Sequence, residues 1–227
     1  MSSDPETQKI QKLCVNLIGC IIKLSFTMTL SNGEIISGVM DNCNIVGDCM
    51  EDFIYPYIRK HIPTFKKGPK QASPDFYNSK WEWELKCFGD SPGFDISNFR
   101  SYISQLEDNL ERKLYTTQYL IFKYVLDDGN ITITDFKLCN VWEIINYTGK
   151  YPISLQSKKN VWHNIRPCSF NAMNSKDKSA FIFIKKICEA IDKCPNNIED
   201  KSKIISNIRR QYYQLEYNKV LTDLPIN

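Results

Sequence analysis

The sequence lacks the spacings that mark zinc-binding, secreted or repetitive proteins. None of its nine cysteines forms a Cys-x-x-Cys pair, and its two histidines, His61 and His163, are far apart, so we expect no structural zinc site. No basic leader opens the chain, and the odd number of cysteines indicates reduced, buried thiols in a reducing, cytoplasmic compartment. No internal repeat or low-complexity segment is visible.

The sequence also lacks a hydrophobic run that could cross a membrane. Its most apolar stretch, residues 13–30, is interrupted by Asn16, Lys23 and Ser25. A charge near the centre of a membrane span costs about 2.5–3.5 kcal/mol. We therefore expect residues 13–30 to be buried core and expect no membrane partner.

The sequence also has no large excess of positive or negative charge. The 227 residues carry a net charge of +3, which excludes a histone-like tail. It does not exclude DNA binding, because acids at a metal site offset basic residues elsewhere. With 42% hydrophobic and 24% charged residues, the chain has the composition of a folded globular protein.

Hydrophobic periodicity predicts a mixed α/β domain. The expected helices are 8–23, 48–59, 96–112, a short one after 139, 180–193 and 201–220. Strand pairs are expected around Asn78 and at 119–126 with 131–138, and a turn or a helix end at Ser31-Asn32-Gly33. We expect one domain, 1–227, with a catalytic core at about 45–140 and a DNA-recognition and helical part at about 141–227.

The segment from Ser73 to Lys86 carries the clearest chemical signal. Pro74-Asp75 precedes a turn, and Glu84-Leu85-Lys86 follows it. Residues two apart on a strand point the same way, so Glu84 and Lys86 share one face while Trp83 and Leu85 take the other. Two carboxylates and an ammonium gathered at a hairpin can hold a divalent metal and activate a water, which is the equipment for cutting a phosphodiester.

The length of the turn decides whether these groups meet. A two-residue turn at Asn78-Ser79 pairs Asp75 with Glu82 and puts Glu84 on the diagonal. A three-residue turn would move Asp75 to the opposite face. The alternative interpretation is a half-buried strand whose charged face is simply solvated.

Pro74-Asp75 followed by Glu84-Leu85-Lys86 resembles the signature of the PD-(D/E)xK nucleases, and within that superfamily the small type II restriction endonucleases. The resemblance implies an α/β (α+β) fold of the restriction-endonuclease type, with a central mixed sheet flanked by helices. It also implies Mg²⁺ as cofactor, double-stranded DNA as substrate, a homodimer, and a DNA methyltransferase as functional partner. The implied reaction is attack of water on phosphorus at a short palindromic site, leaving a 5′-phosphate and a 3′-hydroxyl.

The same resemblance gives each residue of the motif a role. Asp75 and Glu84 are expected to be metal ligands, with the carbonyl of Leu85 as a further ligand. Lys86 is expected to orient the attacking water and stabilise the charge on the phosphate. The alternative for Lys86 is a surface ion pair with Glu84. Glu82 shares the face and could replace Glu84, although only Glu84 has a lysine two residues later.

A further acid is suggested by the preceding helix. Nucleases of this family often direct a helical glutamate into the site, and Glu51 resembles it, with Asp52 as the lesser candidate. The alternative is a capping box, in which Asp48 is the N-cap and Glu51 the residue three positions later. Asp95-Ile96-Ser97-Asn98-Phe99 resembles the segment after the catalytic strand in several small restriction enzymes, and Ser97 or Asp95 is expected to cap the following helix.

A later segment mixes cations, amides and aromatic groups. Cations suit phosphates, and Asn, Gln or Arg suit base edges, so we predict a DNA-binding face there. Its residues are Gln156, Lys158, Lys159, Trp162, His163, Asn164 and Arg166. The alternative is a polar loop with a core tryptophan and solvated lysines. Further candidates for phosphate contacts are Lys66, Lys67, Lys70, Arg209 and Arg210.

These observations predict a Mg²⁺-dependent type II restriction endonuclease. Two alternatives stay open at this point. One is a repair, nicking or structure-selective nuclease with the same fold, and the other is a DNA-binding module that does not cleave.

Overall fold

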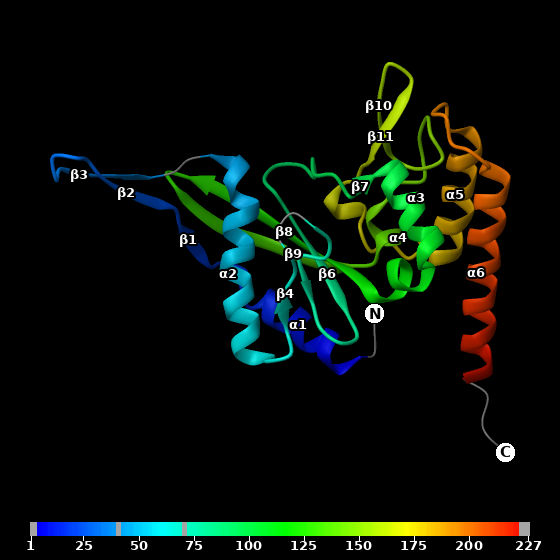
Figure 1. Cartoon of the computed structure of the whole chain (residues 1–227). Helices are drawn as coiled ribbons and strands as arrows, with labels where there is room; N and C mark the ends of the chain where they lie inside the picture. Colours follow the sequence, from blue (N-terminus) through cyan, green and yellow to red (C-terminus); the bar gives the residue numbers. More distant parts are fainter. Residues whose placement is uncertain (1–3, 40–41, 70–71, 223–227) are drawn as a thin grey trace. The chain divides into compact units, whose positions relative to one another are not determined.

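The computed structural model describes residues 4–39, 42–69 and 72–222 (Figure 1). The chain divides into two compact units, one made of residues 1–92 and 118–138, the other of 93–117 and 139–227. Residues 93–117, which lie within the predicted catalytic core of about 45–140, belong to the second unit. The single domain stays a prediction.

The first unit is built on a six-stranded sheet flanked by helices. The strand order is β1-β9-β8-β6-β5-β4. These strands are β1 (Ile21–Lys23), β4 (Lys66–Lys67), β5 (Phe76–Tyr77), β6 (Glu82–Phe88), β8 (Thr117–Asp127) and β9 (Asn130–Cys139). The other elements are α1 (Pro5–Val15), β2 (Ser25–Thr29), β3 (Ile35–Val39), η1 (Cys43–Ile45) and α2 (Val46–His61). The mixed α+β fold is confirmed, as is the β8–β9 pair.

An aromatic cluster fixes the strands beside α2. Trp83 of β6 and Phe76 of β5 are fully buried, and Phe65 packs on both, with ring centroids 5.3 Å from Trp83 and 5.0 Å from Phe76. The helix α2 contributes Met50, Ile54 and Ile58 at four-residue spacing, all fully buried. Complete burial of such a side chain stabilises the fold by about 1.5–3 kcal/mol. The β5–β6 pair is therefore firmly held.

The predicted helix over residues 8–23 is wrong in its second half. Asp4 caps α1 by accepting a hydrogen bond from the Thr7 N–H at 3.1 Å, and the helix ends at Val15. Beyond it the backbone bonds to β9, through Gly19 N–H to the Ile133 carbonyl at 2.8 Å and Ile133 N–H to the Cys20 carbonyl at 3.0 Å. Sheet hydrogen bonds thus replace the helical ones that the apolar spacing indicated.

The expectation that residues 13–30 are buried core is also only half right. Leu13, Leu17 and Leu24 are buried, but Ile21 is 65% exposed, and Phe26 and Met28 of β2 are exposed too. The strands β2 and β3 form a separate two-stranded sheet whose tip is the predicted Ser31–Gly33 turn. Across the described residues, no helix has the length and apolar character needed to cross a membrane.

The second unit combines a small sheet with helices. The sheet has the order β10-β11-β7. The elements of the second unit are β7 (Ser97–Asn98), α3 (Phe99–Asp108), the π-helical turn η2 (Arg112–Thr116), α4 (Val141–Ile144), β10 (Leu155–Lys158), β11 (Val161–Ile165), η3 (Phe170–Ala172), α5 (Ala180–Lys193) and α6 (Lys201–Thr222). The predicted short helix and the helices 180–193 and 201–220 are confirmed.

The helix predicted over 96–112 is shorter at both ends. Its N-cap is Asn98, whose side chain accepts hydrogen bonds from Arg100 and Ser101 N–H groups. The prediction of Ser97 or Asp95 as the cap is therefore wrong, because residues 97–98 pair with β11 as β7. Five of the nine cysteines are buried.

Replacing Gly68 by alanine should destabilise the protein. The N–H of Gly68 donates to the Asp75 carbonyl at 2.7 Å, and an added Cβ would overlap the Pro74 carbonyl oxygen. Such overpacking costs about 1–3 kcal/mol. Thermal unfolding of Gly68→Ala would show a lowered Tm. In Gly47→Ala, the matched control, a Cβ meets no atom within 4 Å in α2, so a gain of about 0.5–1 kcal/mol is expected.

Candidate active site

The turn between β5 and β6 is longer than the predicted two residues. The ladder pairs Phe76 with Trp83 and Tyr77 with Glu82, which leaves a four-residue loop, 78–81. The Asn78 N–H closes the loop by donating to the Trp81 carbonyl at 2.9 Å. The Asn78 side chain accepts from the Lys80 and Trp81 N–H groups, so it holds the wider turn. The predicted pairing of Asp75 with Glu82 is therefore wrong.

This correction shifts the register by two residues, an even number that leaves every side chain on its predicted face. One step beyond the Phe76–Trp83 pair, Asp75 comes opposite Glu84 instead of diagonal to it. Trp83 and Leu85 lie in the core with 0% and 6% exposure. The acids of the motif therefore converge more closely than the two-residue turn would allow.

Short contacts hold both acids in place. Asp75 Oδ2 accepts a hydrogen bond from the Leu85 N–H at 2.6 Å. Glu84, only 8% exposed, accepts at Oε1 from the Ser73 hydroxyl, and its Oε2 lies 3.8 Å from Lys86 Nζ. Asp75 is thus anchored to β6 itself, and Glu84 to the loop that leads into Asp75.

The Leu85 backbone faces the same edge as Asp75. Because β5 begins only at Phe76, the Leu85 N–H extends past the ladder and is satisfied by the Asp75 side chain. In an antiparallel strand the N–H and C=O of one residue point toward the same neighbour. The Leu85 carbonyl is therefore directed toward Asp75, as a ligand role would require.

The electrostatics of the acids show a site with excess negative charge. Burial raises the pKa of Asp75 above its ordinary value, and the nearby Glu84 raises it further, against the opposing effects of Lys86, the Leu85 N–H and Lys67. Burial also raises the pKa of Glu51, and Asp75 adds to that shift. Carboxyl groups such as Asp75 and Glu51, whose pKa values are raised by burial and by a neighbouring acid, fit a divalent cation, which would stabilise their charged forms.

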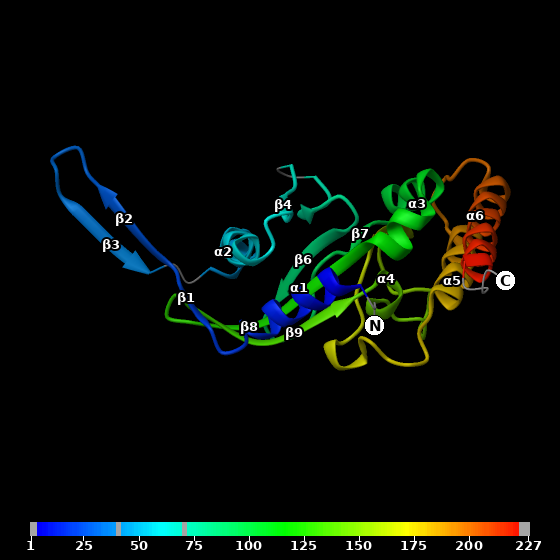
Figure 2. The ribbon, with the colours of Figure 1, turned by 90° about the horizontal axis from the view of Figure 1, so that it is seen from below.

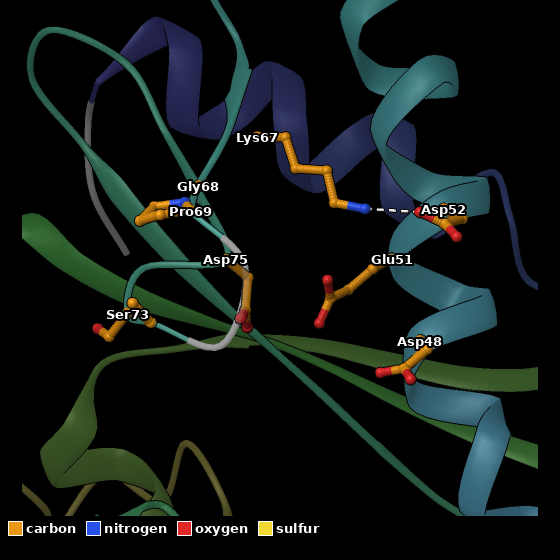
Figure 3. Close-up of a pocket in the computed structure, with 9 residues that line it drawn as sticks. Asp48, Glu51, Asp52, Lys67, Gly68, Pro69, Ser73 and Asp75 are labelled. Carbon is orange, nitrogen blue, oxygen red and sulfur yellow. Dashed lines mark hydrogen bonds and ion pairs between the residues drawn. The ribbon is translucent and has the colours of Figure 1, made fainter.

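The acids open onto a cavity of about 530 Å³ (Figure 3). Figure 3 shows Glu51 directed from α2 toward Asp75, and Lys67 reaching Asp52 across the opening. The lining residues are Asp48, Glu51, Asp52, Lys67, Gly68, Pro69, Ala72, Ser73 and Asp75. Glu84 is not a lining residue, but it accepts a hydrogen bond from Ser73, which does line the cavity.

The helix α2 removes the capping explanation for Glu51. It begins at Val46, and its N-cap, Ile45, makes no side-chain cap bond, so Asp48 lies inside the first turn. The predicted capping box is therefore wrong, and the alternative, a helical acid at the site, agrees with where Glu51 lies. Asp52 instead pairs with Lys67 at 2.6 Å and is 76% exposed at its side chain.

The ligand set itself stays a prediction. Among the described residues, no three Asp, Glu, His or Cys side chains form a group that could hold a metal. Two carboxylates and a carbonyl remain sufficient in principle, because Mg²⁺ keeps several waters and is often held by one or two carboxylates. Glu82 pairs with Tyr77 in the ladder and does not line the cavity.

The predicted DNA-binding segment is a hairpin, not a loop. Its strands β10 and β11 are joined by Lys159-Asn160, both at positive φ (48° and 60°). Lys158 and Lys159 are exposed at its tip, and Gln156, His163, Asn164 and Arg166 are half-buried. Trp162 is 5% exposed and packs edge-on against Phe99 at 5.5 Å. The alternative of a core tryptophan is therefore confirmed.

A carboxylate that the sequence did not single out for this purpose organises the hairpin. Asp95 Oδ1 pairs with Arg166 Nε at 3.0 Å, and Asp95 Oδ2 accepts from Asn164 Nδ2 at 2.8 Å. Asn164 Nδ2 also donates to Gln156 Oε1 at 3.3 Å. Only the spatial pairing of β7 with β11 reveals this network, because 69 residues separate Asp95 from Asn164.

The remaining basic candidates have local partners. Lys66 Nζ lies 5.9 Å from the Tyr77 ring centroid, and Arg210 donates to the Asn207 side chain at 3.0 Å. Arg209 lines a small cavity with Tyr212 on α6. Lys70 lies outside the described residues. Phosphate contact by any of them stays a prediction.

Comparison with known proteins gives the class. The solved structure of the NlaIV restriction endonuclease superposes with a TM-score of 0.72 and 27% identity, covering 92% of this chain and 89% of that one. The type II restriction enzyme NlaIV of Neisseria lactamica is 32% identical over 179 residues, 71% of this chain and 72% of that protein. The type II restriction enzyme NgoBV of Neisseria gonorrhoeae is 27% identical over 144 residues, 57% and 81% of the two chains.

The fold is therefore that of a restriction endonuclease. The sequence model of the NgoBV restriction endonuclease family matches residues 8–224, and this chain belongs to that family. Its relatives bear the names of site-specific deoxyribonucleases, so the predicted enzyme class is confirmed.

Asp75→Asn should stabilise the metal-free protein. A carboxyl with a raised pKa keeps its proton in the folded state at pH values where the unfolded chain has lost it. The contribution of Asp75 to folding stability therefore falls as pH rises from near 3.8 upward. The neutral amide of asparagine removes this loss of stability and can still accept the hydrogen bond from the Leu85 N–H. In EDTA at pH 7 we expect the Tm to rise by a few degrees, since each kcal/mol of stability shifts the Tm of a chain of this size by about 2–4 °C.

The control is Asp52→Asn, which removes an acid that is paired with Lys67 and exposed. It should leave Tm unchanged or slightly lower. An Asp75→Asn protein with a lower Tm than the wild type in EDTA would contradict the charge repulsion described above.

Proposed function

We propose that this protein is a Mg²⁺-dependent type II restriction endonuclease that cuts both strands of double-stranded DNA at a short palindromic sequence. The observation that carries the proposal is the convergence of Asp75 and Glu84 beside Lys86, at a cavity walled by Glu51. Membership in a restriction endonuclease family supplies the substrate class. A homodimer matches a palindrome by symmetry, and a methyltransferase would protect the host's own sites.

In this proposal Asp75, Glu84 and the Leu85 carbonyl hold Mg²⁺. When bound, Mg²⁺ lowers the pKa of a coordinated water and neutralises charge on the phosphate. The protein's contribution is a rigid set of oxygen atoms: Asp75 is fixed by the Leu85 N–H and Glu84 by the Ser73 hydroxyl. Glu51 adds a third negative charge from the opposite wall and orients water through its carboxylate.

Lys86 supplies the positive charge nearest the scissile phosphate. Its ammonium lies 3.8 Å from Glu84 Oε2, longer than a hydrogen bond. An ammonium held at that distance can still donate to the attacking water or to a phosphate oxygen. Lys67, across the cavity, is held by Asp52, which raises the pKa of Lys67 and keeps it charged beside the DNA backbone.

The hairpin β10–β11 is the proposed recognition element. Lys158 and Lys159 at its tip suit phosphates, and the amides of Gln156 and Asn164, ordered by Asp95, suit base edges. His163 adds a further polar group. Arg166 already donates to Asp95 and to the Gly93 carbonyl, so we assign it to holding the hairpin. Trp162 supports the hairpin from the core.

Cleavage tests the active site directly. Unmethylated phage DNA incubated with the protein and Mg²⁺ should give discrete fragments whose sequenced ends share one short palindrome. Asp75→Asn, Glu84→Gln and Lys86→Ala should each lower the cleavage rate by about a thousandfold, because each removes several kcal/mol of transition-state stabilisation.

Glu82→Gln is the matched control, since Glu82 lies on the same strand face but pairs with Tyr77 and not with Asp75. It should cleave at close to the wild-type rate. Loss of cleavage in Glu82→Gln with retention in Glu84→Gln would reverse the assignment. DNA binding in Ca²⁺ without any cleavage in Mg²⁺ by the wild type would leave only a DNA-binding module.

The role of the hairpin tip is measured by salt dependence. For DNA binding in Ca²⁺, Lys158→Ala with Lys159→Ala should reduce the slope of log Kobs against log salt by about 0.9 for each phosphate that the protein no longer neutralises. Lys176→Ala with Lys185→Ala, which removes the same charge from exposed positions elsewhere in the second unit, should leave the slope unchanged. Equal slopes for the tip variant and the wild type would exclude phosphate binding by these two lysines.

A further inference from the structure

One irregularity in the hairpin β10–β11 decides which of its side chains face outward. The ladder pairs Leu155 with Ile165, and then Ser157 with Trp162. Between these pairs β10 has one residue and β11 has two, and such a bulge re-aims the side chains beside it. It lets Trp162 and Ile165 both point into the core, with 5% and 0% exposure. The strand β7 runs directly into α3 (Figures 1 and 2), and Phe99 of α3 packs edge-on against Trp162 on that core side.

The opposite face of the hairpin is polar. Asn164 and Arg166 flank the buried Ile165, so their side chains turn away from the core. Gln156 follows Leu155, the ladder partner of Ile165, and therefore points the same way. The side chains of Gln156, Asn164 and Arg166 are half-buried and are here called the outer face. A ligand that approaches the hairpin from outside meets two amides and a guanidinium.

Asp95 fixes which end of the Asn164 amide is turned inward. Asp95 Oδ1 forms an ion pair with Arg166 Nε at 3.0 Å, and a carboxylate in an ion pair accepts hydrogen bonds but donates none. The atom of Asn164 that lies 2.8 Å from Asp95 Oδ2 is therefore the nitrogen Nδ2. The second hydrogen of Nδ2 is donated to Gln156 Oε1 at 3.3 Å. Both amide hydrogens are used, and the oxygen Oδ1 is the polar atom that remains for a ligand.

The same hydrogen bonds orient Gln156. Its oxygen accepts from Asn164, so its nitrogen Nε2 is the end that can donate to a ligand. In the part of the chain that the structure describes, neither Asn164 Oδ1 nor Gln156 Nε2 has a hydrogen-bond partner in the protein. An acceptor and a donor thus lie side by side on the outer face. Their order depends on Asp95, because the two ends of an amide are so similar in size that packing does not choose between them.

This pattern matches the major-groove edge of a base pair. Adenine presents the amine N6 beside the acceptor N7, and cytosine presents the amine N4 beside the O6 of its paired guanine. The amine can donate to Asn164 Oδ1, and the neighbouring acceptor can take a hydrogen bond from Gln156 Nε2. A keto oxygen in place of the amine would put two acceptors against each other with no hydrogen between them.

We infer that Asn164 contacts the exocyclic amine of one base pair in the DNA, and that Asp95 is the positioning residue that sets this preference. The inference rests on the proposed function, in which this hairpin is the recognition element. Inverting the base pair exchanges the amine and keto positions, so the protein distinguishes the pair from its inverted form at this position. Gln156 strengthens the choice by donating to the neighbouring acceptor.

DNA binding tests the inference without cleavage. The full chain in Ca²⁺ enriches its target from a pool of random duplexes, and the pair that Asn164 contacts is the one whose preference is lost in Asn164→Ala. In the wild type, replacing the amine-bearing base by purine or 2-pyrimidinone, which lack the amine, should weaken binding about tenfold, as expected for one lost hydrogen bond. In Asn164→Ala the same replacement should weaken binding less than about twofold, because the contact is already gone.

A 7-deazapurine in the same base pair, which lacks N7, checks the orientation of the amide. An amide turned over would donate from Asn164 to N7, whereas the inferred orientation leaves N7 to Gln156. Any effect of the 7-deazapurine should therefore persist in Asn164→Ala. An amine replacement that weakens binding by Asn164→Ala as much as by the wild type, or a 7-deazapurine effect that vanishes in Asn164→Ala, would overturn the inference.

Asp95→Asn tests the positioning role. The new asparagine can present either an oxygen or a nitrogen, so the Asn164 amide can turn over and face a keto oxygen. The penalty for inverting the base pair should therefore fall about tenfold, whereas Asp95→Glu, which still only accepts, should keep most of it. A residue that only held the shape of the hairpin would change the affinity for both pairs alike, and an unchanged ratio in Asp95→Asn would overturn its positioning role.

The matched control is Asp192→Asn, which removes the same charge from an exposed position of α5 and should keep the wild-type ratio. If Asp95→Asn does not fold, as judged by circular dichroism, the comparison with Asn164→Ala decides the inference, because that variant leaves the ion pair of Asp95 with Arg166 in place.

Cleavage separates this inference from the proposed function. Binding that depends on the amine, without any cleavage in Mg²⁺, would defeat the endonuclease proposal and leave the inference standing. Cleavage at discrete sites with no dependence on the amine would do the opposite. A wild type that enriches no sequence from the pool would also overturn the inference.

Discussion

The antiparallel pairing of Phe76 with Trp83 determines where each acid of the site lies. Both side chains are buried in one aromatic cluster with Phe65, and that burial holds the strands in a single register. Side chains alternate along a strand. When β6 directs Trp83 and Leu85 into the core, it necessarily directs Glu84 and Lys86 to the opposite face. The hydrophobic effect thus places the polar groups of the candidate site, although none of them is hydrophobic.

The place in which this pairing holds the acids disfavours their ionised forms. Burial and mutual repulsion raise the pKa of Asp75, and Glu51 faces the same negative field from α2. The Leu85 N–H and the Ser73 hydroxyl stabilise the carboxylates in part, and the aromatic core beneath supplies the rigidity. If the acids hold a cation as proposed, the free protein gives up some stability for that function, which is a common relation between stability and function in enzymes.

Much of this arrangement is visible in the sequence, for identifiable reasons. The helices 180–193 and 201–220 and the strands β8 and β9 have strong apolar periods and clear turns, so local pattern and fold agree. The prediction that the acids share one face of the sheet was correct despite the wrong turn length, because a register error of two residues leaves every side chain on the same face. The Asn78 side chain widens the turn by accepting two hydrogen bonds. The sequence does not distinguish this wider turn from an ordinary two-residue Asn-Ser turn. The helical period of 8–23 was overridden by pairing of β1 with β9, and the partnership of Asp95 with Asn164 depends on a fold that no local pattern encodes.

The six-stranded sheet ends in β6, β5 and β4, and the acids lie beside these last strands. At that margin β4 has only two residues, both lysines, a short charged edge that discourages further strand addition. A reaction centre at the rim of a sheet, instead of inside a closed tunnel, can be approached sideways. A long polymer then needs no free end to enter, so the geometry suits scission in the interior of a chain over stepwise removal of its terminal units.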